Sequence, residues 1–146
     1  TGVKPAFAEA TAGKETTIFE AGHDPEIEKL QVGSILELGH VYFKTNDYKL
    51  DSLSYPTLNA LASFMKRHPN LKIEVGGHTN LRPVESFAAQ LSANRAQSVM
   101  HFLTDSGVSA DRVTHEGYGK SRPRINAISK EADRVNQRVE VKVVEK

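Results

Sequence analysis

Apolar residues follow two different periods along this chain, and segments of the two kinds alternate. Residues 137–144, QRVEVKVV, alternate strictly between polar and apolar side chains, which predicts a β-strand with its valines on one face. Residues 54–69 instead carry apolar side chains at helical spacing, which predicts a helix that stops before Pro69. Strands that alternate with helices predict an α/β fold, because each layer must bury its apolar face against the other.

The same two patterns divide the chain from Leu30 onwards. Residues 34–43 alternate with an interruption at Gly39, which predicts a strand with a bulge or kink. The long helical pattern that begins at Val84 ends at Gly107, a residue suited to a helix C-terminus. In chain order, the expected elements are a strand at 34–43, a helix at 54–69, a strand at 71–77, a helix at 84–107, a strand at 111–119, a helical turn at 129–136 and a strand at 137–144. This βαβαβ(α)β order predicts a two-layer sandwich in which a mixed sheet packs on helices.

We expect residues 30–146 to form one domain and residues 1–29 to be an N-terminal linker or tail. Residues 1–29 are rich in Ala, Thr, Gly and Glu and show no sustained period. A short strand around residues 16–19 is expected within this tail, and the alternative is that residues 1–29 are an edge extension of the domain. Because the chain opens at Thr1 without a methionine, we expect it to be a mature or excised piece of a longer protein.

Composition narrows the classes of function. The 146 residues include 19 Lys and Arg against 18 Asp and Glu, so the basic surface typical of nucleic-acid binding is not expected. The absence of cysteine excludes disulfides, thiolate catalysis and cysteine-based zinc sites. No apolar run approaches the roughly 20 residues that span a bilayer, so we expect no membrane insertion. The histidines lack metal-ligand spacing, and we expect neither a metal nor a cofactor.

Arg95 is the residue that most needs an explanation. On a helix over 84–107 it shares one face with Leu91, Val99 and Phe102. A guanidinium keeps its charge, and burying it without a partner costs several kcal/mol. An anion should therefore meet it. The residues alone leave two candidates open, a buried acid of the domain and an anionic ligand.

Five ordered motifs resemble the OmpA C-terminal-like domain, the peptidoglycan-binding module of outer-membrane proteins, peptidoglycan-associated lipoproteins and flagellar-motor stators. The motifs are VYFKTNDYKL at 41–50, GHTN at 77–80, LSANRA at 91–96, GYGKSRP at 117–123 and NQRVEV at 136–141. The resemblance covers roughly residues 30–144. The HTN and NQRVE variants are most similar to members from the Bacteroidetes.

The resemblance implies a domain that binds without catalysis and holds the diaminopimelate residue of the peptidoglycan stem peptide. In the family, a ligand carboxylate pairs with the arginine that corresponds to Arg95, and an aspartate holds the ligand ammonium. That aspartate is Asn80 in this chain, and Ala88 replaces another polar residue of the family pattern. We therefore expect weaker or altered recognition of the ligand and not its abolition, with compensation from a loop acid such as Asp47 or from another residue that the sequence does not reveal.

The other expected ligand-binding residues each have an ordinary structural alternative. Thr79 and Asn80 end a strand and could simply cap a turn. Asn46 is expected to face the pocket, or else to form an Asx-turn. Arg138 points off the core-facing side of the last strand, where it either reaches the ligand or is solvated. Asn136 is expected to hydrogen-bond the loop around Gly119, and His78 to be packed and hydrogen-bonded.

By resemblance, we expect a periplasmic domain, associated with the outer membrane and cell wall, that anchors an envelope protein or complex to peptidoglycan. Other envelope proteins are further expected partners, contacted by parts of the protein that precede Thr1. The alternative is a protein-interaction module of the same fold that has lost or weakened wall binding, with edge strands free to pair. A hydrolase ranks last, because the sequence carries no nucleophile elbow or other organised catalytic motif.

Overall fold

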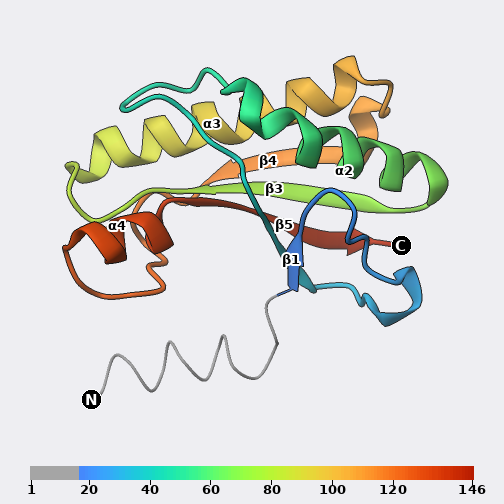
Figure 1. Cartoon of the computed structure of the whole chain (residues 1–146), viewed down its shortest axis with the longest axis horizontal. Coiled ribbons are helices and arrows are strands. Elements are labelled where there is room, and N and C mark those ends of the chain that lie inside the picture. Colours follow the sequence, from blue (N-terminus) through green and yellow to red (C-terminus); the bar gives the residue numbers. More distant parts are fainter. Residues whose placement is uncertain (1–16) are drawn as a thin grey trace.

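A mixed sheet covered by two long helices makes up the part of the protein that the computed structural model describes, residues 17–146 (Figure 1). Five strands lie in the order β1-β2-β5-β3-β4. The elements are β1 (Thr17–Phe19), β2 (Ile35–Leu38), α2 (Tyr55–Arg67), β3 (Lys72–His78), α3 (Glu85–Asp105), β4 (Val113–Gly117), α4 (Lys130–Asn136) and β5 (Arg138–Glu145), with 3-10 turns η1 (Ile27–Lys29), η2 (Ser52–Ser54) and η3 (Ala110–Arg112). The predicted two-layer α/β fold with a mixed sheet is confirmed.

Pairing in the sheet is antiparallel at its centre and parallel at both edges. β5 pairs antiparallel with β2 and with β3, whereas β1 runs parallel to β2 and β4 runs parallel to β3. The β5 valines alternate as predicted, and Val139, Val141 and Val143 are buried in the core. Helices α2 and α3 lie together on one side of the sheet (Figure 1). Polar residues of β5 therefore lie on the opposite face.

The helix boundaries follow local sequence signals. α2 has Pro56 in its first turn and ends before Pro69, as predicted. α3 ends next to Gly107, whose φ of +102° is in the left-handed region that glycine tolerates. The amide of Val108 donates to the carbonyl of Leu103 at 3.0 Å, which closes a Schellman-type cap.

Two expectations about the first strands differ from the structure. β2 ends at Leu38 and does not continue through a bulge at Gly39. His40 has a φ of +61°, so the chain turns there and leaves the sheet. At the N-terminal end, β1 pairs with β2 and Phe19 is fully buried, which matches the edge-extension alternative for residues 17–19. The sheet thus begins before the expected boundary at residue 30, and the tail predicted for residues 1–16 lies outside the described residues.

Glycines let α3 approach the sheet closely and thereby set the position of Arg95. A Cβ atom at Gly77 would lie 2.3 Å from the Ser92 carbonyl oxygen, and one at Gly117 would lie 2.4 Å from the Ala93 amide nitrogen. Contacts this short are impossible, so only glycine fits at these two strand positions. Within residues 17–146, no helix is long and apolar enough to cross a membrane.

Candidate functional site

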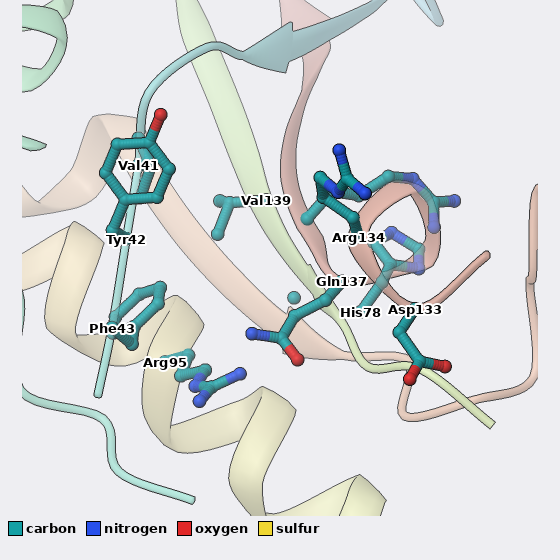
Figure 2. Close-up of a pocket in the computed structure, with 11 residues that line it drawn as sticks. Val41, Tyr42, Phe43, His78, Arg95, Asp133, Arg134, Gln137 and Val139 are labelled. Carbon is teal, nitrogen blue, oxygen red and sulfur yellow. The ribbon is translucent and has the colours of Figure 1, made fainter. Parts of the chain in front are cut away.

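A cavity of about 270 Å³ lies where the C-terminal end of β3 meets the beginning of β5 (Figure 2). Because β3 and β5 are antiparallel, these two ends lie at the same edge of the sheet. The segment after β2, one side chain of α3, two of α4 and the residue that follows α4 complete the walls. The lining residues are Val41, Tyr42, Phe43, Gly77, His78, Arg95, Asp133, Arg134, Gln137, Arg138 and Val139.

Arg95 is the more deeply buried of two buried arginines that line this cavity. Its exposure is 3%. Its Nε donates to the Asp47 carbonyl at 2.8 Å and its Nη2 donates to the Lys44 carbonyl at 3.1 Å. Its guanidinium carbon lies 4.9 Å from the centre of the Phe43 ring, a cation–π contact. Burial lowers the pKa of Arg95, and the nearby charge of Asp47 partly offsets this effect.

The anion expected beside Arg95 is not supplied by the part of the chain that the structure describes. Among residues 17–146, no carboxylate lies within 4.0 Å of its guanidinium nitrogens. The carbonyls leave some of its five N–H groups free. The sequence left two candidate partners open, a buried acid of the domain and an anionic ligand. Residues 17–146 do not provide the buried acid.

Asn46 acts on the site through the backbone. It is exposed, lies outside the cavity wall and has a φ of +56°. It is the third residue of a tight turn closed by a hydrogen bond from the Asp47 amide to the Lys44 carbonyl at 3.0 Å. This turn directs the Lys44 and Asp47 carbonyls at Arg95. The structure thus places Asn46 as a turn residue, and the expectation that it faces the pocket is wrong.

Thr79 and Asn80 border the cavity without lining it. Thr79 is 3% exposed, and its amide donates to the Gly119 carbonyl at 2.8 Å. Asn80 Oδ1 accepts a hydrogen bond from the Arg82 amide at 3.0 Å, the turn-capping role named as its alternative. Asn80 Nδ2 donates to Gln137 Oε1 at 3.4 Å, and Gln137 does line the cavity.

Arg138 lies off the core-facing side of β5 as predicted, and of its two alternatives, ligand contact or solvation, its burial excludes solvation. It is 9% exposed. Its guanidinium donates to Glu140 Oε2 at 2.7 Å and to the carbonyls of Asn136 and Arg122, both at 2.9 Å. These bonds use three of its five N–H groups, and Arg138 forms part of the cavity wall.

Beside Arg138, His78 and Glu140 form a buried pair. His78 Nε2 lies 3.3 Å from Glu140 Oε1, and the His78 ring stacks on Tyr118 with centroids 5.2 Å apart. Burial lowers the pKa of His78. Burial alone would raise the pKa of Glu140, but the hydrogen bond from His78 and the charge of Arg138 outweigh it and hold that pKa at about 2. His78 is packed as expected and pairs with Glu140 through Nε2, whereas its Nδ1 is buried and has no hydrogen-bond partner among residues 17–146.

Asn136 has the expected structural role with a different partner. Its Oδ1 accepts from the amides of Arg124 and Ile125 at 2.8 and 2.9 Å, and its Nδ2 donates to the Ile125 carbonyl at 2.8 Å. It therefore ties α4 to residues 124–125 and makes none of these bonds to the loop around Gly119. Within residues 17–146, no cluster of three or more His, Cys, Asp or Glu side chains has metal-binding geometry.

Sequence reasoning missed the residues that α4 contributes. Asp133 and Gln137 lie one helical turn apart, and the Gln137 amide donates to the Asp133 carbonyl at 3.0 Å. Both line the cavity together with Arg134. In the sequence, Asp133 and Arg134 are polar positions of a short charged helix and Gln137 begins the predicted last strand, and no local signal points to a cavity. The cavity thus presents a buried cation from α3 and a carboxylate from α4, an arrangement that suits a zwitterionic group.

Comparison with known proteins identifies the family. A model of the OmpA family matches residues 42–138. The peptidoglycan-associated lipoprotein of Buchnera aphidicola is 35% identical over 108 residues, which are 74% of this chain and 60% of the lipoprotein. Outer membrane porin F of Pseudomonas aeruginosa is 36% identical over 104 residues, which are 70% of this chain and 30% of the porin. The chain therefore spans only part of the length of these relatives.

Solved structures show the same fold. The periplasmic domain of Helicobacter pylori MotB has a TM-score of 0.69 at 24% identity, covering 79% of this chain and 78% of that domain. The peptidoglycan-associated lipoprotein from Burkholderia pseudomallei has a TM-score of 0.65 at 24% identity, covering 73% of this chain and 88% of the lipoprotein. Since the family model matches more than half of its residues, the chain belongs to the OmpA family.

Proposed function

We propose that this domain binds peptidoglycan without catalysis and holds the diaminopimelate residue of the stem peptide in the cavity beside Arg95. The observation that carries the proposal is the state of Arg95. It is a 3% exposed cation that lines a cavity and has no carboxylate partner among residues 17–146. The names of its relatives support the choice of polymer, since several of them are peptidoglycan-associated lipoproteins.

The proposed contact is an ion pair with a ligand carboxylate. Arg95 Nε and Nη2 donate hydrogen bonds to backbone carbonyls. These bonds fix the orientation of the guanidinium before a ligand binds. A carboxylate in the cavity would accept hydrogen bonds from the remaining N–H groups. A planar guanidinium suits this geometry, and the low exposure of the site strengthens the attraction.

This binding would anchor an envelope protein or complex to the cell wall, and we place the domain in the periplasm on the same grounds. Relatives such as porin F and MotB are envelope proteins with further parts outside the region matched here. The partners proposed for this chain are therefore peptidoglycan and, through the rest of a longer protein, other envelope components.

Sedimentation with purified peptidoglycan tests the proposal. Wild-type protein should pellet with the polymer, and Arg95→Ala should remain in the supernatant. Arg67→Ala is the matched control, because Arg67 is an exposed arginine of α2 that pairs with Asp24 and does not line the cavity. Far-ultraviolet circular dichroism must show that both variants are folded. Undiminished retention of a folded Arg95→Ala would refute the Arg95 assignment.

A protein-interaction module without wall binding is the second candidate function. Asn80 favours it, because its amide oxygen already accepts a hydrogen bond from the Arg82 backbone and carries no charge. Asn80→Asp separates the two candidates. If wild type does not pellet and Asn80→Asp does, the natural domain has given up wall binding for another role.

A further inference from the structure

Asp133 is an acidic residue of the cavity with unused capacity. Its Oδ2 pairs with Arg82 Nε, whereas its Oδ1 is buried and has no hydrogen-bond partner among residues 17–146. A buried carboxylate oxygen without a partner is unusual, because such groups are nearly always satisfied. Asp133 lines the same cavity as Arg95 and comes from a different element, α4. In the view of Figure 2, the Gln137 side chain lies between them.

Asp133 also lies next to the position where the family aspartate is replaced. Residues 80–82 contact α4 and the residue that follows it, since Arg82 Nε pairs with Asp133 and Asn80 Nδ2 donates to Gln137 Oε1. Asp133 and Gln137 are one helical turn apart. Asn80, which contacts Gln137, therefore lies close to Asp133 as well. A carboxylate at position 80 would add a second negative charge near Asp133, on the other side of Arg82, and like charges near one another are unfavourable. An amide at position 80 is therefore compatible with an acid at position 133.

From this geometry we propose that Asp133 holds the ammonium group of bound diaminopimelate, in place of a carboxylate at position 80. The inference rests on the function proposed above, because it concerns the other end of the same zwitterionic group. Arg95 takes the carboxylate from the α3 side, and Asp133 takes the ammonium from the α4 side. The carboxylate has moved from the end of β3 to the facing helix, and the ligand remains the same.

Arg82 is the group that the ammonium displaces. Its side chain is 52% exposed, whereas that of Asp133 is 20% exposed, so the pair lies at the rim of the cavity. An exposed arginine in such a pair is held weakly and can turn into solvent. When Arg82 turns away, both oxygens of Asp133 become available. Without a ligand, Arg82 supplies the positive charge that the Asp133 carboxylate needs.

Titration with two stem peptides tests the inference. One peptide carries diaminopimelate with a free side-chain amine, and the other carries the same residue with that amine acetylated, which removes the ammonium and keeps the carboxylate. Wild type should bind the free-amine peptide at least tenfold more tightly. Asp133→Asn should lose that preference and bind the acetylated peptide as wild type does. Asn80→Asp added to Asp133→Asn should restore the preference, because position 80 contacts Gln137, which lines the same cavity.

Three controls complete the experiment. Asp24→Asn removes the acid of another exposed Arg–Asp pair and should bind both peptides as wild type does. Arg82→Ala should bind the free-amine peptide at least as tightly as wild type, which separates loss of the acid from release of Arg82. Arg95→Ala should bind neither peptide. If Asp133→Asn keeps the full preference while Arg95→Ala loses binding, the inference about Asp133 is overturned and the proposed function stands. If wild type binds neither peptide, both are overturned.

Discussion

Substituting Arg95 tests most directly whether a buried residue of this domain contributes to stability or to ligand binding. We predict that Arg95→Met leaves the domain folded but removes its affinity for a diaminopimelate stem peptide. Methionine keeps most of the apolar stem that packs in α3 and lacks the guanidinium, whose pKa is lowered by burial. The substitution therefore removes the charge while leaving the space nearly filled.

The free energy of unfolding should change by less than about 2 kcal/mol, because opposing contributions nearly cancel. Arg95 loses hydrogen bonds to two carbonyls, each worth about 1.5–3 kcal/mol for a charged donor, and about 1 kcal/mol of contact with the Phe43 ring. Removing the buried charge recovers a desolvation cost of several kcal/mol. Burying the methionine adds about 2 kcal/mol.

Binding should suffer far more than folding. Truncating one member of a buried, hydrogen-bonded charge pair costs about 2–5 kcal/mol, which raises Kd by about 30-fold to several thousand-fold. The two effects therefore differ enough to be separated in a single variant. Unfolding in urea measures the first effect, and calorimetric titration with the stem peptide measures the second.

The opposite result would refute the reasoning. If Arg95 belonged to a structural ion pair within the domain, its removal would leave a buried acid without a partner and cost about 3–5 kcal/mol of stability. Such a loss, with peptide binding unchanged, would show that the anion beside Arg95 comes from the protein itself.

Two further predictions concern stability. Gly77→Ala should destabilise the domain by about 3 kcal/mol or more, because its Cβ would lie 2.3 Å from the Ser92 backbone oxygen and push α3 off the sheet. Gly76→Ala, the adjacent control, should cost clearly less, because its Cβ would meet the Tyr118 ring at 2.9 Å and a side chain can rotate away; urea midpoints that fall equally would contradict this reading of the packing. Stability should also fall with acid, first below the ordinary His78 pKa of 6.5 and more steeply below the ordinary Glu140 pKa of 4.5. Both folded-state pKa values are lowered, so the unfolded chain takes up protons first, and moving the Glu140 pKa to about 2 corresponds to about 3 kcal/mol lost between pH 5 and 2. Urea unfolding between pH 7 and 3 measures the loss, and Glu140→Gln should flatten its lower part; a pH-independent midpoint would show that the pair contributes nothing.

Most of the fold could be predicted from local patterns. The alternation along β5, the apolar stripes of α2 and α3 and the stops at Pro69 and Gly107 each depend on neighbours within a few residues. Long, strongly periodic segments are also those whose burial is least ambiguous. The sheet edge was harder, because β1 spans only Thr17–Phe19 and pairs with a strand about twenty residues away.

The candidate site was only half predictable, because several of its contacts join segments that are distant in the sequence. Arg95 could be recognised because the helical period of one segment already places its charge among apolar residues. Asn46 was assigned the wrong surroundings and the alternatives for Arg138 stayed open, since their contacts depend on a turn and on the carbonyl of Arg122 from another segment.

The sequence by itself determined the order of the elements, the family and the presence of a cation that needs an anion. These depend on periodicity, on motif spacing and on the fixed charge of a guanidinium, all of which are local properties. Only the tertiary structure decided that no acid of the described chain reaches Arg95 and that Asp133 shares its cavity. Which side chains meet across α3, α4 and the end of β3 depends on how these elements pack, and packing brings together residues whose separation along the chain carries no signal.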